Sequence, residues 1–188
     1  ARSVYASFAR GAIHLTSLAT AETVKVIENT FRDVNIAFAN ELAILCEELG
    51  VDAWRAIELA NCHPRVNILS PGPGVGGHCI PVDPQFLSNA HPFATELIQT
   101  ARRVNERMPH IIVRRILERV RITTYTPKIT LLGAAYKADV DDARETPTQV
   151  AERLLTDRGY DVIVYDPLVQ RYDGRLASDF GAAINGAE

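Results

Sequence analysis

The segment Lys128-Ile129-Thr130-Leu131-Leu132-Gly133 decides the fold class of this chain. Its short apolar run ends at a glycine, which predicts a buried β-strand. Thr146-Pro147-Thr148-Gln149 then predicts a helix start, with a capping threonine, a proline in the first turn and a glutamine at the capping-box position. This helix is expected to end at Gly159, and Asp161-Val162-Ile163-Val164-Tyr165-Asp166 predicts a second strand. Strand, crossover helix and strand in this order predict a parallel, Rossmann-like sheet.

The first half of the chain is predicted to be helical. Apolar side chains recur at spacings of three and four residues over about six turns, as on one face of a helix. Gly50 ends this helix and Asp52 can cap a shorter one over residues 53–60. Helix is expected again from about residue 92 to 120, with Pro109 as a kink or as the start of a second helix. The apolar stripe fits an intrachain core or an interface with a second copy; it comprises Ile27, Phe31, Val34, Phe38, Leu42, Leu45 and Leu49.

Together these patterns predict a mainly α central region, residues 1–122, followed by a partial α/β domain with a parallel sheet, residues 123–188. A hydrophobic fraction of 47% with 23% charged residues is typical of a globular protein. The net charge of -3 argues against nucleic acid or an anionic membrane surface as the main partner. No apolar run is long enough to span a membrane, no signal peptide is recognisable, and three irregularly spaced cysteines suit a reduced, cytoplasmic protein.

A glycine- and proline-rich loop is expected between the helical segments, over residues 61–84. It contains Gly72-Pro73-Gly74-Val75-Gly76-Gly77-His78-Cys79-Ile80-Pro81-Val82-Asp83-Pro84. Long loops inside compact domains are usually functional. A thiol on a turn, between a glycine run without side chains and the carboxylate of Asp83, is a candidate nucleophile. Cys79 is therefore expected to react with alkylating agents faster than Cys46, which falls among helical core positions.

The glycines of this loop match the pattern G-x-G-x-x-G at Gly72, Gly74 and Gly77. A dinucleotide fingerprint leaves a strand and opens a helix, whereas Pro81 and Pro84 block a helix here, so the match is interpreted as a coincidence. Such glycines instead allow close approach of the backbone to a ligand, with N–H groups free to bind an oxyanion or phosphate. A flexible hinge is the structural alternative.

Three further clusters of polar residues could support chemistry. Lys25, Asn29 and Arg32 share one helix face, which is either a solvated face or an anion-binding one. Cys62-His63 and His78-Cys79 lack the spacing of zinc motifs, so no metal is expected. Polar and charged residues crowd the loop after the first strand, at the sheet edge where α/β proteins bind ligands, although a charged surface loop is the plainer alternative; they include Tyr136, Lys137, Asp139, Asp141, Asp142, Arg144 and Glu145.

Four motifs together resemble the UDP-glucose/GDP-mannose dehydrogenase family of nucleotide-sugar 6-dehydrogenases. They are Ala21-Glu22-x-x-Lys25-x-x-x-Asn29, Asn40-Glu41, the loop from Pro71 to Pro84, and Gly133-x-Ala135-Tyr136-Lys137 continuing to Arg144-Glu145-Thr146-Pro147. The segment His63-Pro64-Arg65-Val66-Asn67 is similar to the UDP-N-acetyl-D-mannosamine dehydrogenase branch. The resemblance covers nearly the whole chain.

The resemblance implies an NAD-dependent enzyme that oxidises the CH2OH group of a UDP-sugar to a carboxylate in two hydride transfers. UDP-N-acetyl-D-mannosamine is the expected substrate, with another UDP-hexose as the alternative. Cys79 forms the thiohemiacetal and thioester, Lys25 and Asn29 assist at the developing alkoxide, and Asp83 orients the hydrolytic water. By the same resemblance Arg144 contacts NAD and Arg65 reaches across a dimer interface formed by the central helices; the UDP-sugar is held by Arg32, His63, Arg65, the backbone of Gly76, Tyr136 and Lys137.

Members of this family begin with a complete dinucleotide-binding domain, and nothing like it precedes Ala1. The chain is therefore expected to be a fragment that lacks this domain and the end of the C-terminal domain, and to be inactive alone. The alternative is a non-catalytic module for dimerisation and nucleotide-sugar binding.

Overall fold

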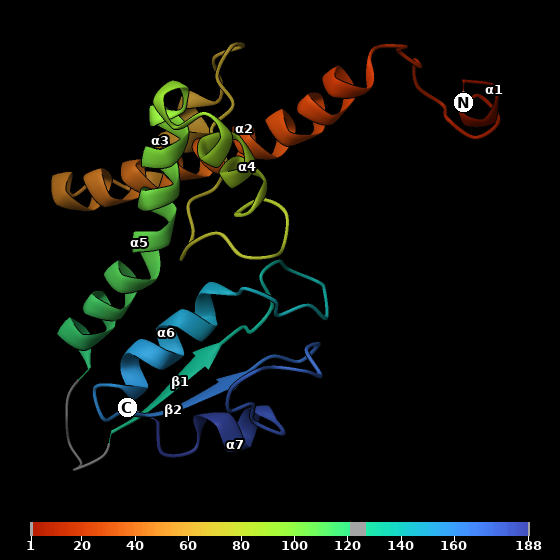
Figure 1. Cartoon of the computed structure of the whole chain (residues 1–188). Coiled ribbons are helices and arrows are strands. Elements are labelled where there is room, and N and C mark those ends of the chain that lie inside the picture. Colours follow the sequence, from red (N-terminus) through yellow and green to blue (C-terminus); the bar gives the residue numbers. More distant parts are fainter. Residues whose placement is uncertain (1, 121–126, 188) are drawn as a thin grey trace.

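The computed structural model describes residues 2–120 and 127–187, which form a group of helices above a small α/β unit (Figure 1). The helical part contains α1 (Arg2–Tyr5), α2 (Leu18–Leu49), α3 (Ala53–Ala60), α4 (Asp83–Ala90), the 3-10 helix η1 (Pro92–Ala94) and α5 (Glu96–Arg119). The second part contains β1 (Lys128–Leu132), α6 (Pro147–Thr156), β2 (Asp161–Tyr165) and α7 (Phe180–Ile184). This order confirms the predicted fold class. The predicted boundary at 122/123 lies outside the described residues.

The ends of the first long helices follow their local sequence. Gly50 terminates α2 in the left-handed conformation, with φ +68°, which costs glycine little because it has no Cβ. Asp52 then caps α3, since its Oδ1 accepts hydrogen bonds from the backbone N–H groups of Trp54 (2.9 Å) and Arg55 (3.2 Å). Both predicted boundaries are confirmed.

The face of α2 that packs on α5 is not the predicted apolar stripe. Ala37 of α2 packs with Ala101 and Val104 of α5 in a small buried cluster. Phe31 and Phe38 face outward and are 59% and 50% exposed. An intrachain core is therefore wrong for most of the stripe, because α5 packs closely against the small and polar side chains of the opposite face.

Prolines mark two differences from the expected helices. The predicted helix at residue 92 begins at Glu96 instead, after the short η1, and continues through Pro109 as one element, so Pro109 does not start a second helix. The sequence analysis missed α4, because Pro84 was taken to block a helix. Pro84 lies in the first turn of α4, where its missing N–H has no helical partner to lose. The segment from Gly72 to Val82, called the Cys79 loop below, leads directly into α4.

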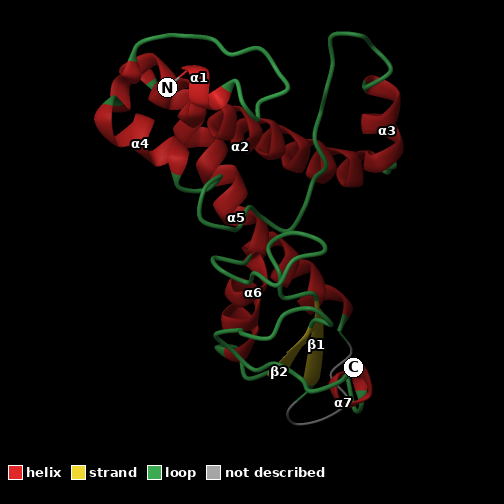
Figure 2. Cartoon of the chain, turned by 90° about the vertical axis from the view of Figure 1, so that its right-hand side faces the viewer, coloured by secondary structure: helices red, strands yellow, loops and turns green. Residues whose placement is uncertain are grey.

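The strands β1 and β2 pair in parallel, with Lys128 opposite Asp161 and Leu132 opposite Tyr165. Figure 2 shows α6 beside the two strands, below α5. The main apolar core lies between these elements and includes Val113, Ile129, Ala151, Leu155 and Val162. The strand prediction is confirmed, but burial is not uniform, since Leu132 at the end of β1 is 63% exposed.

The start of α6 agrees only partly with the expected capping box. Thr146 is the N-cap and accepts from the N–H of Thr148. The side chain of Gln149, however, donates to the carbonyl oxygen of Asp173 (2.8 Å) and not back to the cap, because the loop after β2 lies within its reach. The last helical residue is Thr156, and Gly159 lies in the following turn at φ +87°.

Within residues 2–120 and 127–187, no helix is both long and apolar enough to cross a membrane.

Candidate active site around Cys79

A cavity of about 260 Å3 lies where α2, the Cys79 loop and the loop after β1 meet. Three distant segments of the chain therefore contribute to one site. Most of the residues that the sequence singled out line it: Lys25, Asn29 and Arg32 from α2, Gly76, Gly77, His78, Cys79 and Ile80 from the Cys79 loop, and Tyr136 and Lys137 from the loop after β1. Three of these side chains are cationic at neutral pH, so the cavity suits an anionic ligand.

The Cys79 turn presents an exposed free thiol at this cavity. The carbonyl oxygen of Cys79 accepts hydrogen bonds from the N–H groups of Val82 (3.1 Å) and Asp83 (2.8 Å). These bonds close a tight turn that continues into α4, so the thiol is attached to the start of a helix. Cys46 is buried in α2, as the sequence predicted.

Asn29 and Asp83 connect α2 to this turn. Asn29 Nδ2 donates to Asp83 Oδ2 at 2.5 Å, and Asn29 is buried, so a solvated face is wrong for this member of the α2 cluster. Lys25 remains exposed and lies 3.4 Å from Glu28, in an exposed ion pair that contributes little to stability. Its ammonium group therefore stays accessible to a ligand.

The glycines of the Cys79 loop approach another part of the same chain. A Cβ on Gly76 would lie 2.7 Å from the carbonyl oxygen of Glu145 and 2.8 Å from the Cβ of Tyr136. Gly77, at φ +82°, lies against the Tyr136 ring, and its N–H donates to the carbonyl oxygen of Arg144 (3.1 Å). The prediction that the N–H group of Gly77 is free is therefore wrong. The glycines permit close contact between two loops, where a ligand or a hinge was expected.

Asp166 organises the loop that supplies Tyr136 and Lys137. Its Oδ2 accepts from the N–H groups of Ala134 (2.9 Å) and Ala135 (3.1 Å), and its Oδ1 accepts from two N–H groups of the loop after β2. Burial raises the pKa of this carboxyl, but the four backbone donors outweigh burial and hold the pKa below its usual value. The carboxylate thus bridges two loops at the end of the strands.

Four predicted site residues are not among those that line the Cys79 cavity, and one of them is Asp83, which follows the Cys79 turn. His63 and Arg65 lie in the turn after α3, where the N–H of Arg65 donates to His63 Nδ1 at 3.3 Å. Arg144 lies instead at a broad depression of about 840 Å3 beside the loop after β2. The fold of a single chain therefore does not bring His63 and Arg65 to the thiol cavity, whereas the backbone of Arg144 contacts the Cys79 loop at Gly77.

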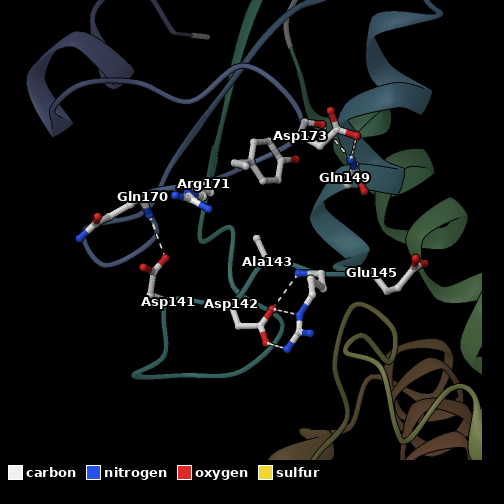
Figure 3. A pocket seen from close by; sticks show the side chains of 10 residues that line it. Asp141, Asp142, Ala143, Glu145, Gln149, Gln170, Arg171 and Asp173 are labelled. Carbon is white, nitrogen blue, oxygen red and sulfur yellow. Dashed lines mark hydrogen bonds and ion pairs between the residues drawn. The ribbon is translucent and has the colours of Figure 1, made fainter.

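Arg144 lines this depression and is held there by Asp142, which Figure 3 labels. Its Nε donates to Asp142 Oδ1 at 2.9 Å and its Nη2 donates to Oδ2 at 2.6 Å, a bidentate pairing. The hydrogen bonds from Arg144 lower the pKa of Asp142 to about 2. The guanidinium therefore has a fixed orientation, and Figure 3 places Arg171 and Asp173 on the other side of the hollow.

Sequence reasoning missed a buried polar network behind the cavity, formed by Asp33, Asn40, Arg102 and Asn105. Polar residues in a helix usually indicate a solvated face, and their pairing across seventy residues leaves no local signal. His78, which the sequence offered only as a possible zinc ligand, lines both the Cys79 cavity and a second cavity of about 420 Å3. Among the described residues, no group of three or more His, Cys, Asp or Glu side chains could hold a metal ion.

Comparison with known proteins supports the resemblance along most of the chain. Residues 19–107 match the model of the central domain of the UDP-glucose/GDP-mannose dehydrogenase family, and residues 130–188 match the model of its UDP binding domain. A UDP-N-acetyl-D-mannosamine dehydrogenase of Methanocaldococcus jannaschii is 46% identical over 100% of this chain and 43% of its own length. An NDP-N-acetyl-D-galactosaminuronic acid dehydrogenase of Ralstonia nicotianae is 46% identical over 90% of this chain and 40% of its own.

A solved structure of the UDP-D-ManNAc dehydrogenase of Pyrococcus horikoshii is similar to the whole chain, with a TM-score of 0.89 and 42% identity. The alignment covers 100% of this chain and 44% of that one. The chain thus spans less than half the length of the relatives it matches. Both matched domain models and the structural similarity indicate one family. The chain therefore belongs to the UDP-glucose/GDP-mannose dehydrogenase family.

Proposed function

We propose that this chain is the thiol-bearing and UDP-sugar-binding part of a dehydrogenase that oxidises UDP-N-acetyl-D-mannosamine to its uronate. The observation that supports this most is the shared cavity of Cys79, Lys25, Asn29 and Lys137. A nucleophilic thiol beside cationic and amide donors is the arrangement that acyl-type chemistry on an aldehyde requires. Another UDP-hexose is the second candidate, because the Ralstonia relative is named for an N-acetylgalactosaminuronic acid.

The proposed chemistry assigns one task to each residue of the cavity. The Cys79 thiolate attacks the aldehyde carbon, a C–S bond forms, and the carbonyl oxygen becomes an alkoxide. Lys25 and Asn29 stabilise that negative charge, and Lys25 returns the proton that the alkoxide needs. Asn29 gives one amide hydrogen to Asp83 and keeps its second for the substrate oxygen.

The thiohemiacetal would become a thioester by loss of a proton from its oxygen and of a hydride from its carbon, the hydride going to the nicotinamide cofactor that the family implies. Thioester hydrolysis completes the proposed reaction. Water attacks the thioester carbon, the C–S bond breaks, and the sulfur leaves as a thiolate while the carboxylate product forms. Asp83 holds Asn29 with Oδ2, and we assign its other oxygen to orienting this water. Arg32, Gly76, Tyr136 and Lys137 are assigned to the substrate, with Lys137 at the diphosphate.

The family implies a nicotinamide cofactor, which accepts hydride from the sugar carbon when it is bound. The described residues fit only one edge of such a site. Arg144, fixed by Asp142, presents a cation to a phosphate or ribose. The glycines at 72, 74 and 77 do not fit a dinucleotide, because they follow no strand, and Gly74 and Gly77 lie against Pro147 and Tyr136. We therefore assign only Arg144 to NAD.

We also propose a homodimer through α2. Its outward stripe leaves large apolar side chains in water, including Ile27, Phe31, Phe38 and Leu45, which favours coverage by a second copy. His63 and Arg65 lie outside the cavity of their own chain, so in this proposal they reach the UDP-sugar of the partner.

Protection of the thiol by the substrate tests the proposed site. UDP-N-acetyl-D-mannosamine is expected to slow the alkylation of Cys79, because the sugar occupies the cavity, and to leave the labelling of the buried Cys46 unchanged. Peptide mapping after timed iodoacetamide labelling measures both thiols in one experiment. Lys137→Gln should weaken the protection at least tenfold in ligand concentration, by about 1.4 kcal/mol. Arg153→Gln, an exposed change on α6, serves as the control. Equal slowing of Cys46, or none at Cys79, contradicts the proposal.

A further inference from the structure

The centre of the α2–α5 contact is polar. Asp33 and Asn40 of α2 are 0% exposed, and Asn105 of α5 is 1% exposed. Buried polar groups gain little stability over apolar residues of similar size even when they are fully paired. Their retention at a helix contact therefore calls for a role other than packing.

These side chains form one continuous chain of hydrogen bonds. Arg102 Nη1 donates to Asp33 Oδ1 (2.6 Å), and Asn105 Nδ2 donates to Asp33 Oδ1 and to its carbonyl oxygen (both 2.9 Å). Asn40 Nδ2 donates to Asn105 Oδ1 (2.9 Å). Asn40 Oδ1 finally accepts from the backbone N–H of Gly72 (2.8 Å), the first residue of the Cys79 loop.

The donors and acceptors of these hydrogen bonds can be arranged in only one order. The carbonyl oxygen of Asp33 can only accept, so Asn105 must turn its NH2 group toward Asp33. The Asn105 side-chain oxygen then faces Asn40, so Asn40 must donate to it from its own NH2 group. The oxygen of Asn40 is left facing Gly72, where the loop needs an acceptor. Asn105 thus sets the orientation of Asn40 although it makes no hydrogen bond to the loop.

We propose that Asn40 and Asn105 form a relay of positioning residues that fixes the Cys79 loop against α2. The relay holds the loop at Gly72, Arg144 holds it at Gly77, and the turn into α4 holds it at Cys79. Lys25 and Asn29 belong to the same helix as Asn40, so α2 is the common support for the thiol loop and the groups facing it. The catalytic consequence rests on the proposed function, since small displacements of reacting groups cost large factors in rate.

Hydrogen exchange of the Cys79 loop tests the relay on the chain itself. In Asn40→Ala and Asn105→Ala, a peptide covering residues 70–79 should take up deuterium about fivefold faster, the factor expected for one lost hydrogen bond. The effect of Asn105→Ala is decisive, because the hydrogen bonds of this residue reach the loop only through Asn40. Cys46 alkylation, measured in parallel, reports unfolding of α2 and should stay slow in both variants.

Val34→Ala is the matched control, because Val34 packs between α2 and α5 without belonging to the hydrogen-bond chain. It lowers stability through lost packing and should leave exchange of the loop peptide unchanged. Wild-type exchange in Asn105→Ala, or an equal rise in Val34→Ala, overturns the relay.

Asn40→Asp keeps the inference testable if an alanine variant fails to fold. The substituted side chain retains an oxygen for Gly72 but loses the NH2 group that Asn105 Oδ1 requires. Faster loop exchange in this variant supports the relay, and wild-type exchange reduces it to a single contact and overturns it. None of these readouts needs a UDP-sugar. A loosened loop in a chain whose Cys79 gains no protection from substrate would leave the relay intact and contradict the proposed function alone.

Discussion

At the residue scale, the carboxylate of Asp166 connects two loops of the α/β part. Its two oxygens join the loop after β1, which carries Tyr136 and Lys137, to the loop after β2 through four backbone N–H groups. An ionised carboxylate can accept all four bonds, whereas an amide presents its own N–H groups to two of the donors. The ionised form is therefore stabilised by folding, which is why the pKa of Asp166 lies below its usual value.

Asp166→Asn should therefore destabilise the chain at pH 7 by about 2 kcal/mol. Because the folded pKa is lowered, the contribution of wild-type Asp166 is complete above the unfolded pKa and is lost as pH falls through the folded pKa. The difference between variant and wild type should shrink from about pH 5 downward. Urea unfolding at several pH values measures it. A difference that stays constant down to pH 2 contradicts this assignment, and Asp157→Asn, at the exposed end of α6, is the control.

At the scale of elements, α3 depends on its cap more than a longer helix would. It has only eight residues, which is marginal for a helix without tertiary support, although it packs against α2. Asp52 supplies two hydrogen bonds to its first turn. The turn after α3 contains His63 and Arg65, so the cap also helps to fix the segment proposed to reach a partner.

Asp52→Ala should destabilise α3 by about 1 kcal/mol, because two N–H groups of its first turn lose their acceptor. Trp54, the single tryptophan, lies in that turn and reports the change by fluorescence during urea titration. Asp52→Asn retains a capping oxygen and should remain within a few tenths of a kcal/mol of wild type. Equal loss in both variants would show that the negative charge, not the cap, stabilises this turn.

At the scale of the whole molecule, the helical part has more apolar surface than its own chain covers. Most of the stripe on α2 points away from α5, although its member Val34 packs at that contact, and Leu49 at its end is 66% exposed. Contiguous apolar surface of this kind is typical of protein–protein contacts. A two-fold contact would place the same stripe on both copies.

Phe38→Glu should convert the proposed dimer to a monomer, because a charge would be buried at the centre of the α2 stripe. Sedimentation velocity across a range of concentrations measures the assembly. Leu168→Glu makes the same change at an exposed apolar position in the α/β part and should leave the dimer intact. A wild-type chain that sediments as a monomer throughout would overturn the homodimer proposal.

The sequence alone determined the features that depend on neighbouring residues. Gly50 and Asp52 set helix boundaries, the two apolar runs set a parallel strand pair, and the Cys79 motif indicated the thiol site, because caps, turns and motifs act within a few residues. Only the tertiary structure decided which face of α2 is buried and what the glycines of the Cys79 loop approach. Burial and close approach depend on partners far along the chain: Asn40 meets Asn105, and Gly77 meets Tyr136, through contacts that no local pattern records.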